Sequence, residues 1–122
     1  MSLPIFSRNQ GEIAQSNANL NVLDLSLAAS RRTVEGSVEA AYLDVAAKRT
    51  QVELYRDNLV PATLKLEAMA EESYRAGKSN VLTVIDAQRR TNDIKRAYLD
   101  SLFSFQSAFA NLEEVVGVTL GP

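Results

Sequence analysis

The sequence predicts an all-α protein, a long antiparallel, coiled-coil-like helical hairpin with helices over about residues 10–75 and 80–116. Apolar residues recur with heptad spacing through most of the chain, as in helices that pack along one side. One strong helix breaker, Gly77, separates the two periodic stretches. A glycine at such a position ends a helix by adopting a positive φ. Because the linker is only about three residues long, the two helices should run antiparallel.

The composition excludes several classes of function. The 122 residues allow one domain, and the net charge of -2 gives no reason to expect nucleic acid binding. The sequence contains no Cys and no His, which removes thiol and imidazole chemistry and the usual zinc ligands. Glu67, Glu71 and Glu72 lack the histidines that a di-metal helical bundle needs. We therefore predict no catalytic residues, no metal site and no cofactor, and we do not expect an enzyme.

The first residues have the pattern of a different element. Residues 1–6 are apolar and interrupted by Pro4, which is typical of the end of an edge strand. Asn9 and Glu12 have the spacing of a capping box and predict that a helix starts there. No signal peptide pattern is present, and no apolar run approaches the roughly 18 residues of a membrane-spanning helix. These features predict either a cytosolic protein or a piece of a larger chain.

The first predicted helix carries a heptad seam with two repeating positions. One position holds Ile13, Leu20, Leu27, Val34, Ala41, Lys48, Tyr55, Ala62 and Met69, and the other holds Asn17, Asp24, Arg31, Val38, Val45, Val52, Leu59 and Leu66. The seam is apolar from Val38 to Met69, whereas in the first half its second position is polar. Pro61 lies inside this helix, where it lacks an N–H and presses on the carbonyl of Asp57. We predict a kink at Pro61 with the heptad pattern unchanged across it.

The second predicted helix is shorter and ends at Gly117. Its seam consists of Tyr98, Leu102, Phe105, Phe109, Leu112 and Val116. Outward-facing ion pairs at i,i+4 spacing are predicted for Glu71–Arg75, Arg89–Asp93 and Arg96–Asp100. The two helices should be roughly 100 Å and 55 Å long, so they do not match in length. The apolar residues in the first half of the longer helix therefore need partners from other chains, from further sequence or from a fold-back.

Three stretches, taken in order, resemble a known family. Residues 2–12 (SLPIFSRNQGE) resemble a passage from a β-barrel strand into a periplasmic helix. Residues 72–77 (ESYRAG) resemble the motif E-x-Y-x-x-G, and residues 81–88 (VLTVIDAQ) resemble the V-L-D-A-Q that follows a hairpin tip. With residues 97–99 and 112–113 they cover nearly the whole chain. This ordered set resembles the TolC family of outer membrane efflux proteins, the outer membrane components of tripartite pumps.

The resemblance implies a homotrimer in the bacterial outer membrane, with a β-barrel joined to a long α-helical tunnel. Residues 1–122 would form a single periplasmic helical hairpin of that protein, and residues 1–6 would be the remnant of a barrel strand. The hairpin would contribute to the tunnel wall. Its partner would be a periplasmic adaptor protein, and an inner membrane pump would be engaged indirectly.

The resemblance also assigns candidate site residues. The tip and adaptor contact would comprise Tyr74, Gly77, Lys78 and Ser79, and the tunnel entrance would comprise Asp86 and Thr83. In the family the tip tyrosine helps to hold the entrance closed, the tip glycine lies at the adaptor contact, and the aspartate lines the constriction. Ser79 and Thr83 depart from the best-known member, which has an arginine and a second aspartate there. The gating network and the acidic ring are therefore thinner in this sequence.

Spacing alone leaves other interpretations open. The turn at Gly77 can be a plain connection, and Asp86 can be an ordinary helix-surface charge. The chain can also be a soluble structural hairpin that only oligomerises, or the hairpin of a periplasmic adaptor protein. Adaptor hairpins are flanked by lipoyl-like β halves, which residues 3–6 do not resemble. A signal peptide and a second strand-helix repeat upstream of Met1 in the parent gene would favour the efflux protein.

Overall fold

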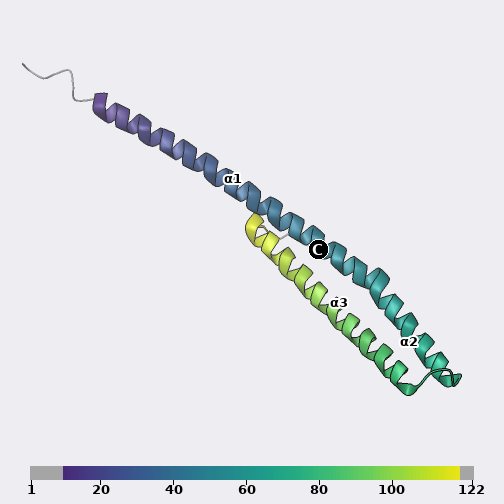
Figure 1. Cartoon of the computed structure of the whole chain (residues 1–122). Helices are drawn as coiled ribbons and strands as arrows, with labels where there is room; N and C mark the ends of the chain where they lie inside the picture. The colour runs from purple at the N-terminus through teal and green to yellow at the C-terminus, as the bar shows by residue number, and fades with distance from the viewer. Residues whose placement is uncertain (1–9, 119–122) are drawn as a thin grey trace, which may run out of the picture. The chain divides into compact units, whose positions relative to one another are not determined.

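The computed structural model describes residues 10–118 of the chain, and every regular element in this range is helical. In order, the elements are α1 (Gln10–Leu54), the π-helix η1 (Tyr55–Leu59), α2 (Val60–Arg75) and α3 (Val81–Val116) (Figure 1). The predicted all-α hairpin is therefore confirmed, with the reversal between α2 and α3. The strand remnant predicted at residues 1–6 lies outside the described residues.

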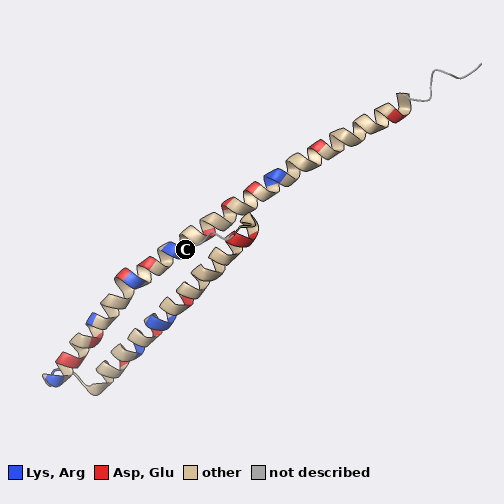
Figure 2. Cartoon of the chain, turned by 180° about the vertical axis from the view of Figure 1, so that it is seen from behind, with Lys and Arg blue, Asp and Glu red and all other residues tan. Residues whose placement is uncertain are grey.

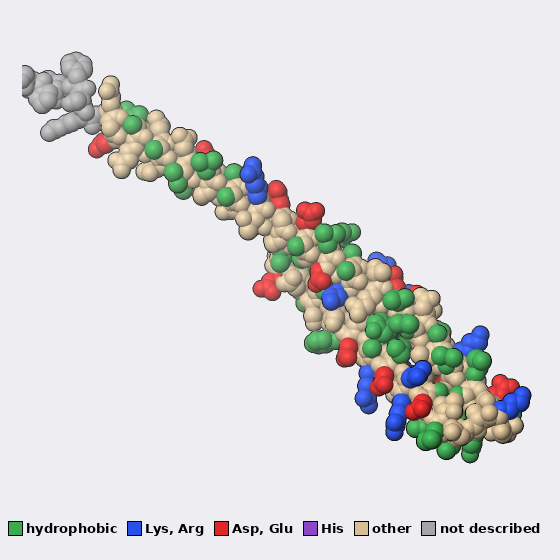
Figure 3. Space-filling model, in the orientation of Figure 1, with side chains coloured by type: hydrophobic (Ala, Val, Ile, Leu, Met, Phe, Trp, Pro, Cys, Tyr) green, Lys and Arg blue, Asp and Glu red, His purple; other side chains and the backbone are tan. Residues whose placement is uncertain are grey.

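The chain divides into two units, Met1–Ser37 and Val38–Pro122. Residues 10–37 of the first unit belong to α1, and all of them are exposed. Its large apolar side chains are each more than half exposed: Ile13, Leu20, Val22, Leu23, Leu25, Leu27 and Val34. Figure 3 shows such hydrophobic side chains on the molecular surface. That these residues acquire partners in an assembly stays a prediction.

The second unit is a hairpin in which α3 lies alongside α2 and the end of α1 (Figure 1). The face that α3 buries has a regular spacing of three and four residues: Val84, Ala87, Thr91, Ile94, Tyr98, Ser101, Phe105, Ala108, Leu112 and Val115. Five residues of the unit are fully buried: Ala41, Thr91, Ser101, Ala108 and Leu112. Four of these five side chains are small, so the core is thin and the helices pack through short side chains.

The seam predicted for α3 is half right. Tyr98, Phe105 and Leu112 lie on the buried face, as the spacing predicts. Tyr98, Leu102, Phe105 and Phe109 are all half-buried, Val116 is 39% exposed, and Ser101 and Ala108 take buried positions that the prediction left out. A helix has two candidate stripes one residue apart, and here the one with Ser101 and Ala108 is the more buried.

Pro61 is accommodated by a π-helical turn directly before it, where the helix changes direction (Figure 1). The N–H of Val60 donates to the carbonyl oxygen of Tyr55, five residues back instead of four. Pro61 then follows in the first turn of α2, where its missing N–H costs little. The wider turn relieves the clash that an α-helix would create between the proline ring and the carbonyl of Asp57. The helical path therefore continues through Pro61 without a break.

The π-helix shifts the buried face of the chain by one residue, which corrects the predicted seam. Up to Leu59, the half-buried and buried positions follow the predicted heptad. Beyond η1 the predicted positions Ala62, Leu66 and Met69 are exposed. The half-buried positions are instead the next residues along the chain: Thr63, Glu67 and Ala70. One extra residue in the turn rotates everything that follows, so the heptad does not continue unchanged.

Charged residues of both signs are mixed along α2 and α3 (Figure 2). Among the predicted pairs, Arg75 and Glu71 form an ion pair at 3.3 Å. Within residues 10–118, no ion pair joins Arg89 to Asp93 or Arg96 to Asp100, so those two predictions are wrong. Such exposed pairs contribute little to stability. No helix in this range has the length and apolar character of a membrane span.

Candidate functional site at the hairpin turn

The turn between α2 and α3 is closed by two backbone hydrogen bonds around Gly77. The N–H of Gly77 donates to the carbonyl oxygen of Tyr74 at 2.9 Å, and the N–H of Lys78 donates to that of Ser73 at 2.9 Å. This pair of bonds is a Schellman motif, which requires a left-handed residue after the last helical turn. Gly77 has a φ of 70°, as the sequence predicts. The reversal is therefore a defined structure.

The start of α3 is capped by Asn80. Its Oδ1 accepts from the backbone N–H and from the hydroxyl of Thr83, each at 3.1 Å. Thr83, predicted at the tunnel entrance, thus has a structural role in the cap. The Ser79 hydroxyl oxygen is shielded from solvent and has no hydrogen-bond partner among the described residues.

The other predicted tip residues are accessible. Tyr74 is 48% exposed, Gly77 and Lys78 are exposed, and Ser79 is half-buried. A Cβ atom added to Gly77 would meet no atom within 4 Å. The close-packed hairpin therefore does not require a glycine for space at this position. A glycine is favoured at this position only because of the positive φ. The space in front of Gly77 is open to a partner.

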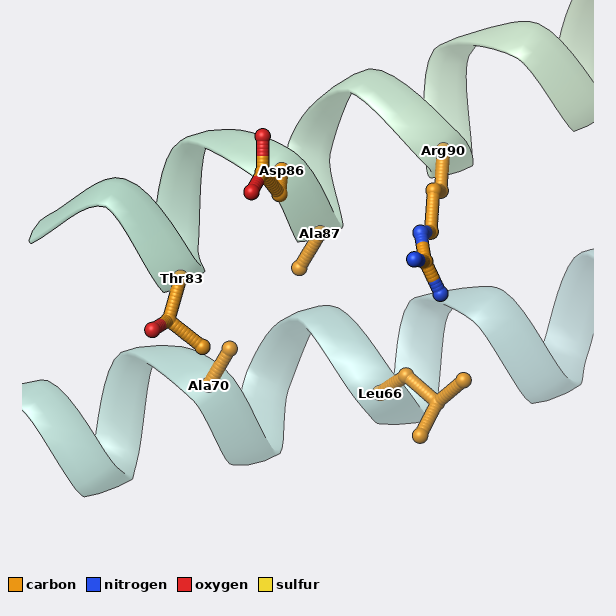
Figure 4. A pocket seen from close by; sticks show the side chains of 6 residues that line it. All are labelled: Leu66, Ala70, Thr83, Asp86, Ala87 and Arg90. Carbon is orange, nitrogen blue, oxygen red and sulfur yellow. The ribbon is translucent and has the colours of Figure 1, made fainter. Parts of the chain in front are cut away.

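A shallow hollow of about 320 Å³ lies between α2 and α3 next to the turn. It is lined by Leu66, Ala70, Thr83, Asp86, Ala87 and Arg90 (Figure 4). The two predicted entrance residues, Thr83 and Asp86, lie one turn apart and share this hollow. Figure 4 shows Thr83 directed toward α2 and the Asp86 carboxylate turned away from it. The Asp86 carboxylate is therefore available to solvent or to another chain.

Arg90 is a member of this hollow that sequence reasoning missed. Figure 4 shows its side chain extended toward α2, on the side where Leu66 lies. The available signal was its position four residues after Asp86, which places both on one helix face. The Arg89–Arg90 doublet instead has the pattern of a solvated face. The structure brings Thr83, Asp86 and Arg90 together, and leaves Tyr74 and Gly77 apart from them at the turn.

The turn and the hollow present accessible polar and charged groups. A group of three or more Asp, Glu, His or Cys side chains able to hold a metal ion does not occur within residues 10–118. What the turn offers is exposed backbone at Gly77, an exposed tyrosine, and charges of both signs beside the hollow. The fold and this turn define a helical hairpin protein with an accessible tip.

Comparison with known proteins identifies the family. Residues 1–118 match the family described as "Outer membrane efflux protein". The chain is 25% identical over 115 residues to the cobalt-zinc-cadmium resistance protein CzcC of Cupriavidus metallidurans. It is 27% identical over 120 residues to the probable efflux pump outer membrane protein TtgC of Pseudomonas putida. No significant match to a solved structure was found. The chain belongs to the outer membrane efflux protein family, in agreement with the resemblance of its motifs.

The matches cover nearly all of this chain but only part of each relative. They span 94% of the chain and 28% of CzcC, and 96% of the chain and 24% of TtgC. The chain therefore corresponds to about a quarter of the length of these relatives. The family is one of efflux and transport proteins of the outer membrane.

Proposed function

We propose that this chain is one periplasmic hairpin of an outer membrane efflux channel, with its tip as the contact for a periplasmic adaptor protein. One observation carries the proposal. The family match runs over residues 1–118 and falls on a hairpin whose turn is exposed and unobstructed at Gly77. In this assignment the helices form part of the tunnel wall, and the segment lies in the periplasm. An inner membrane pump is engaged indirectly, through the adaptor.

The proposal includes a homotrimer. Large apolar side chains are exposed in both units, including Leu25 at 72% and Phe103 at 76%. Exposed apolar surface on this scale favours burial against further helices. A tunnel wall requires neighbouring hairpins as partners. These would come from the same protein and from the other two subunits of the trimer. The barrel and the complete tunnel would belong to a chain about four times as long, given the share of each relative that is matched.

Each predicted site residue has a role in this proposal. Gly77 lets the adaptor backbone approach closely, with Tyr74, Lys78 and Ser79 around it. Asp86, with its carboxylate turned away from α2, lines the tunnel entrance. Three such carboxylates around a narrow opening would attract cations and repel one another. Thr83 carries no charge, so the acidic ring has one carboxylate per chain.

The decisive experiment for the tip compares two substitutions of Gly77 in the complete protein. Gly77→Ala introduces only the strain of a side chain at positive φ, worth about 1 kcal/mol. Gly77→Trp adds bulk into space that is empty within the hairpin. We expect Gly77→Trp to abolish efflux and adaptor cross-linking at an unchanged level of trimer, and Gly77→Ala to pump. Normal efflux by Gly77→Trp would show that the tip is a plain turn.

The entrance assignment is tested separately with Asp86→Asn. This change removes one charge per chain with little change in size, and we expect altered conductance or cation block of the reconstituted channel with adaptor binding retained. Asp93→Asn is the matched control, because Asp93 is also an exposed carboxylate on α3. Equal currents from the native protein and both variants would make Asp86 an ordinary surface charge.

A further inference from the structure

Helix α2 presents two parallel stripes, one residue apart, of which only one is packed. The packed stripe comprises Val60, Thr63, Glu67 and Ala70, all half-buried. The exposed stripe comprises Ala62, Leu66 and Met69, with Leu66 and Met69 each 56% exposed. The exposed stripe is the more apolar of the two, and it is the one that continues the heptad of α1. This is the reverse of what burial of apolar surface favours.

The π-helix η1 selects the packed stripe. Its extra residue turns Thr63, rather than Ala62, toward α3. A π turn is less favourable than an α turn and is found mostly as a single local distortion. The local reason for it here is Pro61, since an α-helix would press the proline ring on the carbonyl of Asp57. The choice of stripe therefore rests on a small local preference.

The contacts that hold the packed stripe are weak. Within the described residues, one side-chain hydrogen bond links α2 and α3, from the Thr91 hydroxyl to the carbonyl oxygen of Thr63 at 3.3 Å. The same hydroxyl lies closer to the carbonyl oxygen of Ala87, at 3.1 Å. Glu67 brings a charged side chain into a half-buried position. Beside this seam, the hollow lined by Leu66 and Ala87 leaves room at the interface.

We propose that η1 and Pro61 form a register joint with two states. In the state seen here, the turn is π-helical and Thr63 faces Thr91. In the second state the turn is α-helical, and α2 is rotated about its own axis by about one residue, or roughly 100°. Ala62, Leu66 and Met69 then pack against α3, and the hydrogen bond from Thr91 to Thr63 is lost. The exchange alters which side chains the tip half of the hairpin shows to its surroundings.

Cysteine pairs report the two states directly, because the sequence contains no cysteine. Thr63→Cys with Thr91→Cys reports the π state, and Ala62→Cys with Thr91→Cys reports the α state. Both pairs are made in the complete protein and treated with a short bis-methanethiosulfonate cross-linker, and the free thiols remaining are counted by mass. The readout needs neither an adaptor nor efflux, so its failure is distinct from failure of the proposed function.

We expect the Thr63–Thr91 pair to dominate with Pro61 present and the Ala62–Thr91 pair to form slowly. Pro61→Ala should raise the rate of the Ala62–Thr91 pair relative to the other by about tenfold or more, because the penalty against the α-helical turn is removed. The control combines Pro61→Ala with deletion of Asn58. Removing one residue makes the turn α-helical while keeping Thr63 toward α3, so it should cross-link only through position 63. If Pro61→Ala gives the same ratio as the native protein or this control, the joint has one state and the proposal is wrong.

Discussion

The stem and the tip half of the hairpin share α3 but pair it with different helices, and they are held together differently. The stem joins the end of α1 to the later part of α3 and contains four of the five fully buried residues: Ala41, Ser101, Ala108 and Leu112. The tip half joins α2 to the first part of α3 and contains only Thr91. In the tip half, Cα atoms of α2 and α3 approach within 8 Å of each other. The stem therefore contains most of the buried side chains, whereas the helices of the tip half approach each other more closely.

The difference indicates that the tip half is the less stable part of the hairpin. Few buried apolar side chains and a single interhelical hydrogen bond mean that local opening there should cost less free energy than opening of the stem. This suits a region proposed to bind a partner, because contacts in a complex can supply the stabilisation that the isolated hairpin lacks. The turn itself is well defined by its Schellman motif and by the Asn80 cap.

The largest effect is expected from truncating the stem core. Leu112 is 7% exposed, and Leu112→Ala should lower the free energy of unfolding by about 2–4 kcal/mol. Met69→Ala is the control, because Met69 occupies a seam position of the heptad predicted from the sequence but is 56% exposed in the structure. It should change stability by less than about 0.5 kcal/mol. Urea unfolding followed by circular dichroism measures both, and equal losses would contradict the register assigned to α2.

A smaller effect is expected in the tip half from Thr91→Val. The substitution keeps the shape of this side chain, which is 1% exposed, and removes the hydroxyl shared between two carbonyl oxygens. We expect a loss of about 1 kcal/mol, together with faster hydrogen exchange in α2 and little change in the stem. Exchange measured by mass spectrometry locates the effect. Uniform acceleration over both halves would mean that the hairpin opens as one unit.

The smallest effect concerns the junction between the two halves. The Arg56 guanidinium donates two hydrogen bonds to the Asp57 carboxylate, at 2.7 and 2.9 Å, and these bonds lower the pKa of Asp57. A carboxyl group with a lowered pKa stabilises the folded state above its ordinary pKa and loses that contribution as the pH falls through the lowered value. Both side chains are exposed, so the contribution is minor.

The measurement compares thermal unfolding of the native chain and Asp57→Asn at neutral pH and at successively lower pH, until the Asp57 carboxylate is protonated. The native chain should be slightly more stable at neutral pH, and the difference should shrink on acidification. A difference that is independent of pH would show that the pair contributes nothing through its charge. Arg56→Gln is the matched variant for the other partner and should give the same trend.

The reversal at Gly77 could be predicted from local sequence, whereas the other candidate site residues were implied by the resemblance to the family. Gly77 follows a helix-favouring run, and its positive φ agrees with the prediction. Ser79 and Asn80 both have side chains that can cap a helix, and the extended backbone of Asn80 decides between them. Arg90 was missed because the sequence around a charged residue on a helix surface does not indicate which residues of another helix lie next to it. Its place beside Leu66 depends on how α2 and α3 pack.

The sequence by itself determined where the helices begin and end and where the chain reverses. Helix propensity, capping and the positive φ of glycine depend on a few neighbouring residues. The amino-acid sequence therefore determines them directly. Only the tertiary structure decided which stripe of α2 faces α3. Two stripes one residue apart both satisfy helical spacing, and a single π turn before Pro61 moves the interface from Leu66 to Glu67. That choice depends on the π turn before Pro61 together with the packing of α2 against α3, and periodicity along one helix contains neither.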